Sequence, residues 1–138
     1  MRIRDAVNDV RAWNETFGHL NPNSDEQDER WSTDGEHVLL ALNLVQEEVE
    51  ELHDAAWDDD KVEILDAVCD ILVTVFGLAA KAGVDQYVED GFREVMESNW
   101  SKADEYGHPV YVESGKIGKS DQYRPPNLES ILNEEIAF

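Results

Sequence analysis

Acidic residues recur at helical spacing inside the most apolar stretch of the chain. In residues 61–80, KVEILDAVCDILVTVFGLAA, almost every position from Ile64 onward is apolar, yet Glu63, Asp66 and Asp70 recur at steps of three and four. Those steps place the three carboxylates on one face of a helix. A helix that is apolar on most of its circumference is normally buried, and a buried carboxylate is costly unless it is paired or holds a metal. The pattern therefore predicts a buried helix whose acids meet a cation.

A second group of acids precedes this stretch. Within residues 45–52, VQEEVEEL, Glu47 and Glu51 are four positions apart and Glu48 and Glu51 are three apart, so all three project from neighbouring positions of a helix. If the two helices pair antiparallel across residues 57–60, acid faces acid. Hard divalent cations such as Mg²⁺ or Mn²⁺ suit these oxygen ligands better than zinc. The core-facing stripe of the helix is expected at Val38, Leu42, Val45, Val49 and Leu52.

Carboxylates clustered on two facing helices suit phosphoryl chemistry. They can hold two or more magnesium ions, which bridge phosphate oxygens and lower the pKa of a water molecule. Phosphoryl transfer requires little else beyond positioning and charge stabilisation. An acidic protein binds a polyanion through such cations or through a local basic patch. The candidate patch is the near-neutral segment 102–124, with Lys102, Lys116, Lys119 and Arg124.

The net charge excludes several classes of partner. The 138 residues include 32 Asp and Glu against 11 Lys and Arg, a formal charge of −21, which opposes direct binding to nucleic acid or to an anionic membrane. No apolar run has the length of a membrane span, and the N-terminus MRIRDAVND lacks a signal-peptide core. The single cysteine, Cys69, is expected to be a small core residue. A reducing cytoplasm is the simplest location.

Apolar periodicity predicts an all-α protein with a four-helix core. Residues 5–17 form a first helix that Gly18 ends. Residues 20–30 have almost no apolar content after the first and are expected to be a solvated, mobile loop. Thr33 and Glu36 have the spacing of a capping box, which would begin the helix that carries Glu47, Glu48 and Glu51.

The second half of the core follows the same logic. Asp60 and Glu63 form a second capping pattern, and Gly83 is the expected stop of a helix that continues to Lys81. A fourth helix is expected at about residues 85–98. Its buried side would consist of Tyr87, Val88, Phe92, Val95 and Met96.

The C-terminal part is expected to be a tail on a single domain. The domain comprises residues 1–138, with a core at about 33–102 and a tail at about 103–138. Residues 109–112 are a candidate arm of a short hairpin, and Asn127 is expected to cap a last helix. The apolar face of that helix would be Leu128, Ile131, Leu132 and Ile136.

Two motifs carry a resemblance to a known superfamily. Glu48-x-x-Glu51 is followed, after eleven intervening residues, by Glu63-x-x-Asp66. This resembles the ExxE…ExxD signature of the all-α nucleoside triphosphate pyrophosphohydrolases, which include MazG proteins, dimeric dUTPases and phosphoribosyl-ATP pyrophosphohydrolase. The pair Glu47-Glu48 matches the MazG form.

Longer stretches resemble a compact MazG-like branch common in phages and bacteria. The run DAVCDILVTVFGLAAKAGVD is similar to that branch's DALADLLYVTYGTALALGID. The segments ESNWSK and YGHPVYVESGKIGKSDQYRPPNLESIL are similar to its SNMSK and its GKP-Y-DGKV-K-Y-PPDL ending. The resemblance covers roughly residues 38–132. Departures include Trp100 in place of methionine, and they leave base recognition open.

The resemblance implies roles for particular residues. It implies magnesium ligation by Glu48, Glu51, Glu63 and Asp66. Glu47 would be an extra ligand or, like Glu48, an acid that orients or deprotonates the attacking water. Asp70 stands where phosphoribosyl-ATP pyrophosphohydrolases tend to have histidine, and it would ligate a further ion or hold a water molecule. The substrate contacts implied by the tail are Asn99, Lys102, Lys116, Lys119 and Tyr123.

The implied reaction is hydrolysis of a nucleoside triphosphate to the monophosphate and pyrophosphate, with two or more Mg²⁺ or Mn²⁺ ions per site. Superfamily members assemble as dimers or as tetramers of dimers, so we expect a homo-oligomer and favour a homotetramer. Phage enzymes of the branch often reshape the deoxynucleotide pool used for phage DNA, in the host cytoplasm. Some favour dGTP, which is therefore the leading candidate substrate.

Other interpretations remain open. The substrate could instead be dUTP or phosphoribosyl-ATP, although position 70 is not histidine and the tail is phage-like. An acidic DNA mimic is a non-enzymatic alternative, but such a protein would keep its apolar helices free of acids. Glu63 could merely cap its helix and Glu50 is expected to be an ordinary exposed acid. Trp13 is expected in the core more than as a stacking platform, and the four histidines show no zinc spacing.

Overall fold

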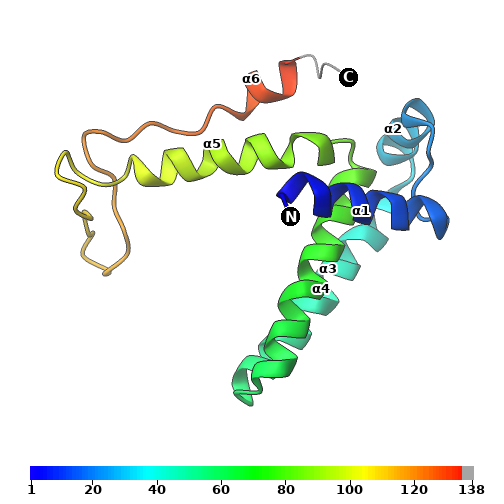
Figure 1. The fold of residues 1–138 in the computed structure, drawn as a ribbon, viewed down its shortest axis with the longest axis horizontal. Coiled ribbons are helices and arrows are strands. Elements are labelled where there is room, and N and C mark those ends of the chain that lie inside the picture. The colour runs from blue at the N-terminus through cyan, green and yellow to red at the C-terminus, as the bar shows by residue number, and fades with distance from the viewer. Residues whose placement is uncertain (135–138) are drawn as a thin grey trace. The chain divides into compact units, whose positions relative to one another are not determined.

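The computed structural model describes residues 1–134. Within that range the chain is helical, with no β-strand, which confirms the all-α prediction (Figure 1). It forms two compact units, residues 1–86 and the part from Tyr87 onward. None of the helices in the described range has the length and apolar content needed to cross a bilayer. The elements are α1 (Ile3–Thr16), α2 (Ser24–Thr33), α3 (Gly35–Trp57), α4 (Lys61–Lys81), η1 (Asp85–Tyr87), α5 (Val88–Trp100) and α6 (Leu128–Asn133).

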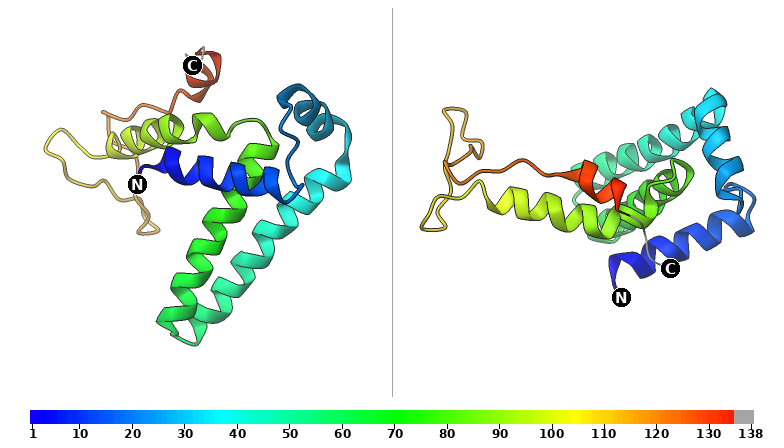
Figure 2. Two further views of the ribbon diagram at one scale, coloured as in Figure 1. Left: turned by 45° about the vertical axis from the view of Figure 1, so that its right-hand side comes forward. Right: turned by 90° about the horizontal axis from the view of Figure 1, so that it is seen from above.

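Helices α3 and α4 form an antiparallel hairpin and make the most extensive contact in the first unit (Figure 2). Small residues are buried where helices meet, and these include Ala41 and Ala55 on α3 and Ala67 on α4. Small side chains allow two helix axes to approach closely. The Asp60 carboxylate accepts a hydrogen bond from the Glu63 N–H at 3.2 Å, so the predicted cap of α4 is confirmed.

Much of the hairpin's apolar surface remains exposed, which contradicts the prediction of a buried helix. Helix α4 packs mainly on α3, with smaller contacts to α1 and α2, and these neighbours cover only part of its circumference. Cys69 is exposed and is not a core residue. Leu42 and Val49 of the expected α3 stripe are also exposed. The exposed apolar residues of α4 include Val62, Leu65, Val68, Leu72, Val73 and Val75.

Helix α2 replaces the loop that low apolar content predicted. Asn23 caps the helix, because its side-chain oxygen accepts from the Glu26 N–H at 3.0 Å. Buried Leu20 precedes the helix, and buried Gln27 anchors it. The helix is therefore stabilised by a cap and by polar tertiary contacts that apolar periodicity does not reveal.

The predicted capping box at the start of α3 is also wrong. Thr33 ends α2, and its hydroxyl donates to the carbonyl of Glu29 at 2.8 Å. Asp34 is the N-cap of α3 instead, and its carboxylate accepts from the His37 N–H at 3.2 Å. An aspartate is as good a cap as threonine, so the one-residue shift has a simple local cause.

A buried hydrogen-bond network joins α2 to α3 and α4. The Gln27 Oε1 accepts from the Asn21 N–H, which fixes the orientation of the amide. Its Nε2 then donates to the Lys81 carbonyl and lies 3.0 Å from His37 Nε2. Because that amide nitrogen can only donate, the His37 Nε2 accepts and the imidazole is neutral. Burial lowers the pKa of His37, and the positive charges of Arg30 and Lys81 lower it further.

An ion pair and a close packing contact help to tie helix α1 to the unit. Arg11 donates from Nε and Nη2 to the two oxygens of buried Asp85, both at 2.7 Å. Asn14 lies against Gly77 of α4, where an added Cβ would come within 3.3 Å of the Asn14 Nδ2. Gly18 ends the helix with φ of 79°, as expected.

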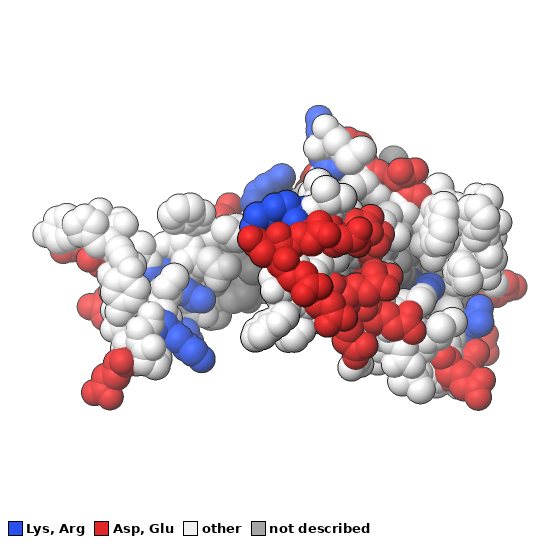
Figure 3. Space-filling view, turned by 90° about the horizontal axis from the view of Figure 1, so that it is seen from below, with Lys and Arg blue, Asp and Glu red and all other residues white. Residues whose placement is uncertain are grey.

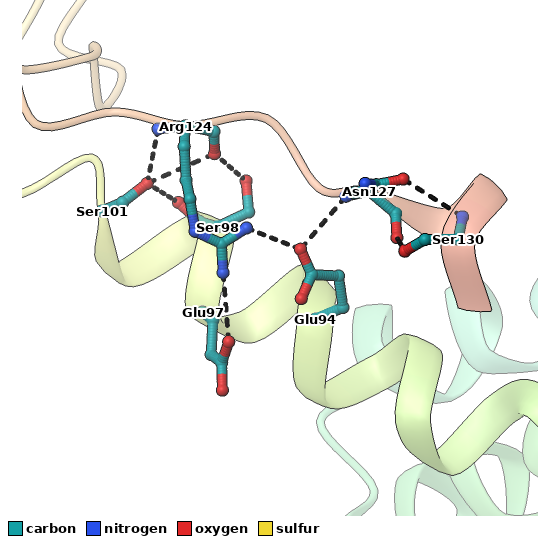
Figure 4. Close-up of polar contacts among 7 residues, drawn as sticks. All are labelled: Glu94, Glu97, Ser98, Ser101, Arg124, Asn127 and Ser130. Carbon is teal, nitrogen blue, oxygen red and sulfur yellow. Dashed lines mark hydrogen bonds and ion pairs between the residues drawn. The ribbon is translucent and has the colours of Figure 1, made fainter. Parts of the chain in front are cut away.

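In the second unit the tail is bound to α5 through Arg124 (Figure 4). Its guanidinium donates to Glu94 at 2.6 Å and to Glu97 at 3.0 Å, and its carbonyl accepts from the Ser98 hydroxyl at 2.8 Å. The Arg124 hydrogen bond is the main reason that the pKa of Glu94 is lowered, with a contribution from the Asn127 N–H. Arg124 is therefore a structural cation and not a free member of the predicted basic patch.

The remaining predictions for this unit are partly correct. The hairpin is reduced to one bridge between Tyr111 and Ile117. Phe92, expected on the buried side of α5, is exposed. Asn127 caps α6 as predicted by accepting from the Ser130 N–H, whereas Ile136 lies outside the described residues.

The neutral state of His37 gives a test of the α2 network. Protonation of His37 would remove the nitrogen that accepts from Gln27. The new positive charge would be repelled by Arg30 and Lys81, and only Asp34 would favour it. Since the folded-state pKa is lowered, this stabilisation is present above the unfolded value of about 6.5 and is lost as pH falls below it. At pH 7.5, His37→Leu should lower the free energy of unfolding by about 1–3 kcal/mol, because it leaves a buried donor unpaired.

The difference between wild type and His37→Leu should narrow from pH 7.5 to 5.5 in thermal or urea unfolding. His53→Leu is the matched control, because the His53 side chain is 78% exposed. A difference that stays constant over this range would show that His37 does not titrate as the network requires.

Candidate metal centre

Three carboxylates from α3 and α4 converge on one point. Glu48 and Glu51 are one helical turn apart on α3, and Asp70 lies on the facing side of α4. One carboxylate oxygen of each residue lies within 4.8 Å of those of the other two. The antiparallel packing of the hairpin thus brings acid opposite acid, as the spacing predicted.

The charges of this cluster are unfavourable in the protein alone. The Glu48 Oε2 is buried and has no hydrogen-bond partner among the described residues. Burial raises the pKa of Glu48, and the negative charges of Glu51, Asp70 and Glu47 raise it further. Burial also raises the pKa of Asp70, with contributions from Asp66 and Glu51. An unpaired buried oxygen among like charges is a costly arrangement that a cation would relieve.

The donor set fits a hard divalent cation. All three converging groups are carboxylates, and oxygen ligands of this kind suit Mg²⁺ or Mn²⁺, whereas zinc sites usually include histidine or cysteine. The unpartnered Glu48 Oε2 supplies a ligand atom that is already oriented and free of competing bonds. The cluster meets the chemical requirements of the predicted metal site.

The other predicted acids lie around this cluster but outside it. Glu47 is close enough for its charge to affect Glu48, and Asp66, exposed on α4, affects Asp70 in the same way. Glu63 lines an open pocket of about 380 Å³ together with Glu51. That pocket also contains acids from the turn between α3 and α4, and acidic side chains gather over this end of the hairpin (Figure 3). Ligation by Glu63 and Asp66 stays a prediction.

The predicted substrate contacts all lie in the second unit. Asn99 is exposed near the end of α5, and Lys102 follows the helix. The Lys119 ammonium lies 4.7 Å from the centre of the Tyr123 ring, a cation–π geometry that places two of the predicted residues together. Lys116 is exposed. Contact of these residues with a nucleotide stays a prediction.

A pocket adjoining the acid cluster was missed in the sequence. It has a volume of about 230 Å³, and its lining includes Glu48 and Asp70 together with Trp13, Asn14 and Lys81. Trp13, expected in the core, is 50% exposed. A lysine in the last turn of a helix is ordinarily explained by the helix dipole, so the sequence pattern does not mark Lys81 as a site residue. The signal in the sequence is a single lysine flanked by alanines, in the run AAKAG of residues 79–83.

Comparison with known proteins agrees with this geometry. An uncharacterized protein of Acanthamoeba polyphaga mimivirus is 40% identical over 76 residues, which are 55% of this chain and 30% of the viral protein. The chain thus spans less than a third of the length of that relative. The sequence profile of the family described as phosphoribosyl-ATP pyrophosphohydrolase matches residues 10–99, well over half of the chain, and the matched range contains the entire acid cluster. The chain therefore belongs to the phosphoribosyl-ATP pyrophosphohydrolase family, a family of nucleotide pyrophosphohydrolases.

Proposed function

We propose that the protein hydrolyses (deoxy)nucleoside triphosphates between the α and β phosphates, giving the monophosphate and pyrophosphate. The observation that carries this proposal is the convergence of Glu48, Glu51 and Asp70 with an unpartnered buried oxygen on Glu48. The family match supports pyrophosphohydrolysis in general. The cofactor would be Mg²⁺ or Mn²⁺, two or more per site.

The acids divide into two roles in this proposal, metal ligation and proton acceptance. The divalent ions would supply positive charge to the phosphate oxygens and make water more acidic. Glu48, Glu51 and Asp70 would hold the ions, with Glu63 and Asp66 completing the set. Glu47 is exposed beside Glu48 and would accept the proton of the attacking water. A group that accepts this proton has to lie beside the ion ligands, which matches the position of Glu47 next to Glu48.

The proposed substrate is a deoxynucleotide, with dGTP as the leading candidate. The resemblance to the compact MazG-like branch favours it, including the tail motifs that would place Asn99 and Lys102 near the phosphates. Phosphoribosyl-ATP, named in the family description, and dUTP are the alternatives. Asp70 belongs to the acid cluster, whereas phosphoribosyl-ATP pyrophosphohydrolases tend to have a histidine at this position. The aspartate therefore does not favour phosphoribosyl-ATP as the substrate.

The proposed assembly is a homo-oligomer, a tetramer in preference to a dimer. Exposed apolar residues on α3 and α4, among them Leu42, Leu65 and Leu72, support it, because monomers rarely expose large contiguous apolar patches. The charge of −21 opposes direct binding to nucleic acid or anionic membrane. The free Cys69 thiol fits a reducing cytoplasm, that of the host if the gene is viral. An acidic DNA mimic gives no reason for acids clustered between packed helices.

Removal of ligands should abolish turnover. Glu51→Gln and Asp66→Asn should each lower metal-dependent pyrophosphate release by about a hundredfold or more, because a lost ligand displaces the ions. The assay measures pyrophosphate against orthophosphate from the common ribo- and deoxynucleoside triphosphates, with Mg²⁺, with Mn²⁺ and with chelator.

The matched control is Glu50→Gln, which neutralises an exposed acid of the same helix. Full activity in both ligand variants would remove the metal assignment. No metal-dependent pyrophosphate from any nucleotide, including phosphoribosyl-ATP, would refute the proposed reaction.

Neutralising Glu48 should stabilise the metal-free protein. The folded-state pKa of Glu48 is raised, so its ionised form costs stability at neutral pH, and the cost disappears as pH falls toward the unfolded value. At pH 7.5 in chelator, Glu48→Gln should raise the Tm by roughly 2–5 °C. Mg²⁺ or Mn²⁺ should raise the Tm of wild type and of Glu50→Gln. The same ions should raise the Tm of Glu48→Gln by much less. An equal metal response in all three would mean that the ions bind elsewhere.

Lys102 should act on substrate and not on metal. Lys102→Ala should raise KM about tenfold, as expected for loss of a charged phosphate contact, while the metal-induced rise in Tm stays unchanged. Arg93→Ala is the control, since Arg93 is an exposed cation of the same unit paired with Asp90. An unchanged KM would exclude Lys102 from the site.

A further inference from the structure

Lys81 is a largely buried lysine whose ammonium has no acceptor among the described residues. It is 4% exposed in the last turn of α4, and its backbone carbonyl accepts from Gln27. No residue in the described part of the chain forms a hydrogen bond or ion pair with its ammonium group, and the nitrogen is not among the fully buried atoms without a partner, so it is open at its tip. Burial lowers the pKa of Lys81, and the charge of Arg30 lowers it further. Since Lys81 lines a pocket, an ammonium that no residue accepts from can donate to a molecule bound there.

The position of Lys81 relative to the acid cluster is set by α4. Asp70 and Lys81 line the same pocket and are eleven residues apart, about three turns or 16 Å along the helix axis. Helical side chains lean toward the N-terminus, which for Lys81 is the direction of Gly77 and Asp70. The pocket therefore has the acids at one end and a cation at the other. A ligand whose phosphates meet the metal end would present its nucleoside toward Lys81.

The walls between the two ends suit a planar heteroaromatic ring. Trp13 is aromatic, Leu44 and Val73 are apolar, and Gly77 has no side chain to fill the space. Asn14 is 4% exposed, and its Nδ2 donates to the Val10 carbonyl at 2.9 Å. Its Oδ1 receives no hydrogen bond from the described residues. The pocket lining therefore includes a donor on Lys81, an acceptor on Asn14 and an aromatic wall, which are the kinds of group that recognise a base.

We propose that Lys81 donates a hydrogen bond to the carbonyl oxygen at position 6 of a purine or position 4 of a pyrimidine. The enzyme would thereby select keto bases over amino bases. This inference rests on the proposed function, whose leading substrate, dGTP, carries such an oxygen. An amino group at that position is itself a donor, so opposite an ammonium it would leave both groups unpaired. A site built around a hydrogen bond discriminates far more strongly than an apolar pocket does.

Two nucleotide pairs isolate this contact. In the first pair, dITP has a keto oxygen where dATP has an amino group. In the second pair, dUTP has a keto oxygen where dCTP has an amino group. Wild type should turn over the keto member of each pair with a kcat/KM about tenfold higher or more. Lys81→Met should bring both ratios close to one by slowing the keto substrates. The monophosphates dIMP and dAMP give the same ratio from binding, without turnover.

Lys61→Met is the matched control. It removes an exposed lysine from the other end of α4, which is paired with Asp59, and should leave both ratios unchanged. A tenfold keto preference in wild type that Lys81→Met abolishes would support the inference.

Three results would overturn it. One is a wild-type preference for the amino bases, which needs no variant and so does not depend on whether Lys81→Met folds. Another is an equal loss for all four nucleotides in Lys81→Met, which would assign the lysine to phosphate. The last is an unchanged ratio. In each case turnover by wild type would leave the proposed reaction intact, whereas no turnover of any nucleotide would refute the reaction and the inference together.

Discussion

The carboxylates between α3 and α4 repel one another, and the hairpin has to hold them together against that repulsion. Glu48, Glu51 and Asp70 approach within 4.8 Å while one oxygen of Glu48 is buried and unpaired. A flexible loop would move such groups apart. Two long helices packed through small residues do not, because their backbone hydrogen bonds are internal and the register of the hairpin fixes every side chain. The hairpin holds the acids in an arrangement that is unfavourable until positive charge arrives.

The shorter helices α1 and α2 help to shape the pocket beside the acid cluster. Asn14 lies against Gly77, so α1 comes close enough to α4 to form one wall of the pocket. Gln27 connects α2 to the backbone at Lys81 and to His37, which fixes the end of the pocket far from the acids. The first unit therefore combines an acidic end, determined by the hairpin and proposed to bind metal, with an end determined by α1 and α2 and proposed to bind the nucleoside.

Local patterns predicted the convergence of three acids but not the other end of the pocket. The recurrence of Glu48, Glu51 and Asp70 at helical steps needs only the geometry of a helix and one antiparallel turn, so the cluster was predictable. Helix α2 depends on the tertiary hydrogen bonds of Gln27, which leave no mark on apolar periodicity. The exposure of Leu65 and Cys69 could not be predicted either, since an apolar stripe looks the same whether it faces its own chain or another. The position of Lys81 in a pocket was not predicted, because a cation in the last turn of a helix is common.

The binding of the tail to α5 has a consequence for how this protein can diversify. Ser101, Ser120 and Arg124 close residues 102–123 into a loop, because both of its ends are hydrogen-bonded at the same place. The entropy of closing a loop rises only slowly with its length. Insertions and substitutions between the fixed ends therefore cost little stability and leave α5 undisturbed. The loop, which carries most of the proposed substrate contacts, can therefore change in length and sequence while the acids of the hairpin stay constant.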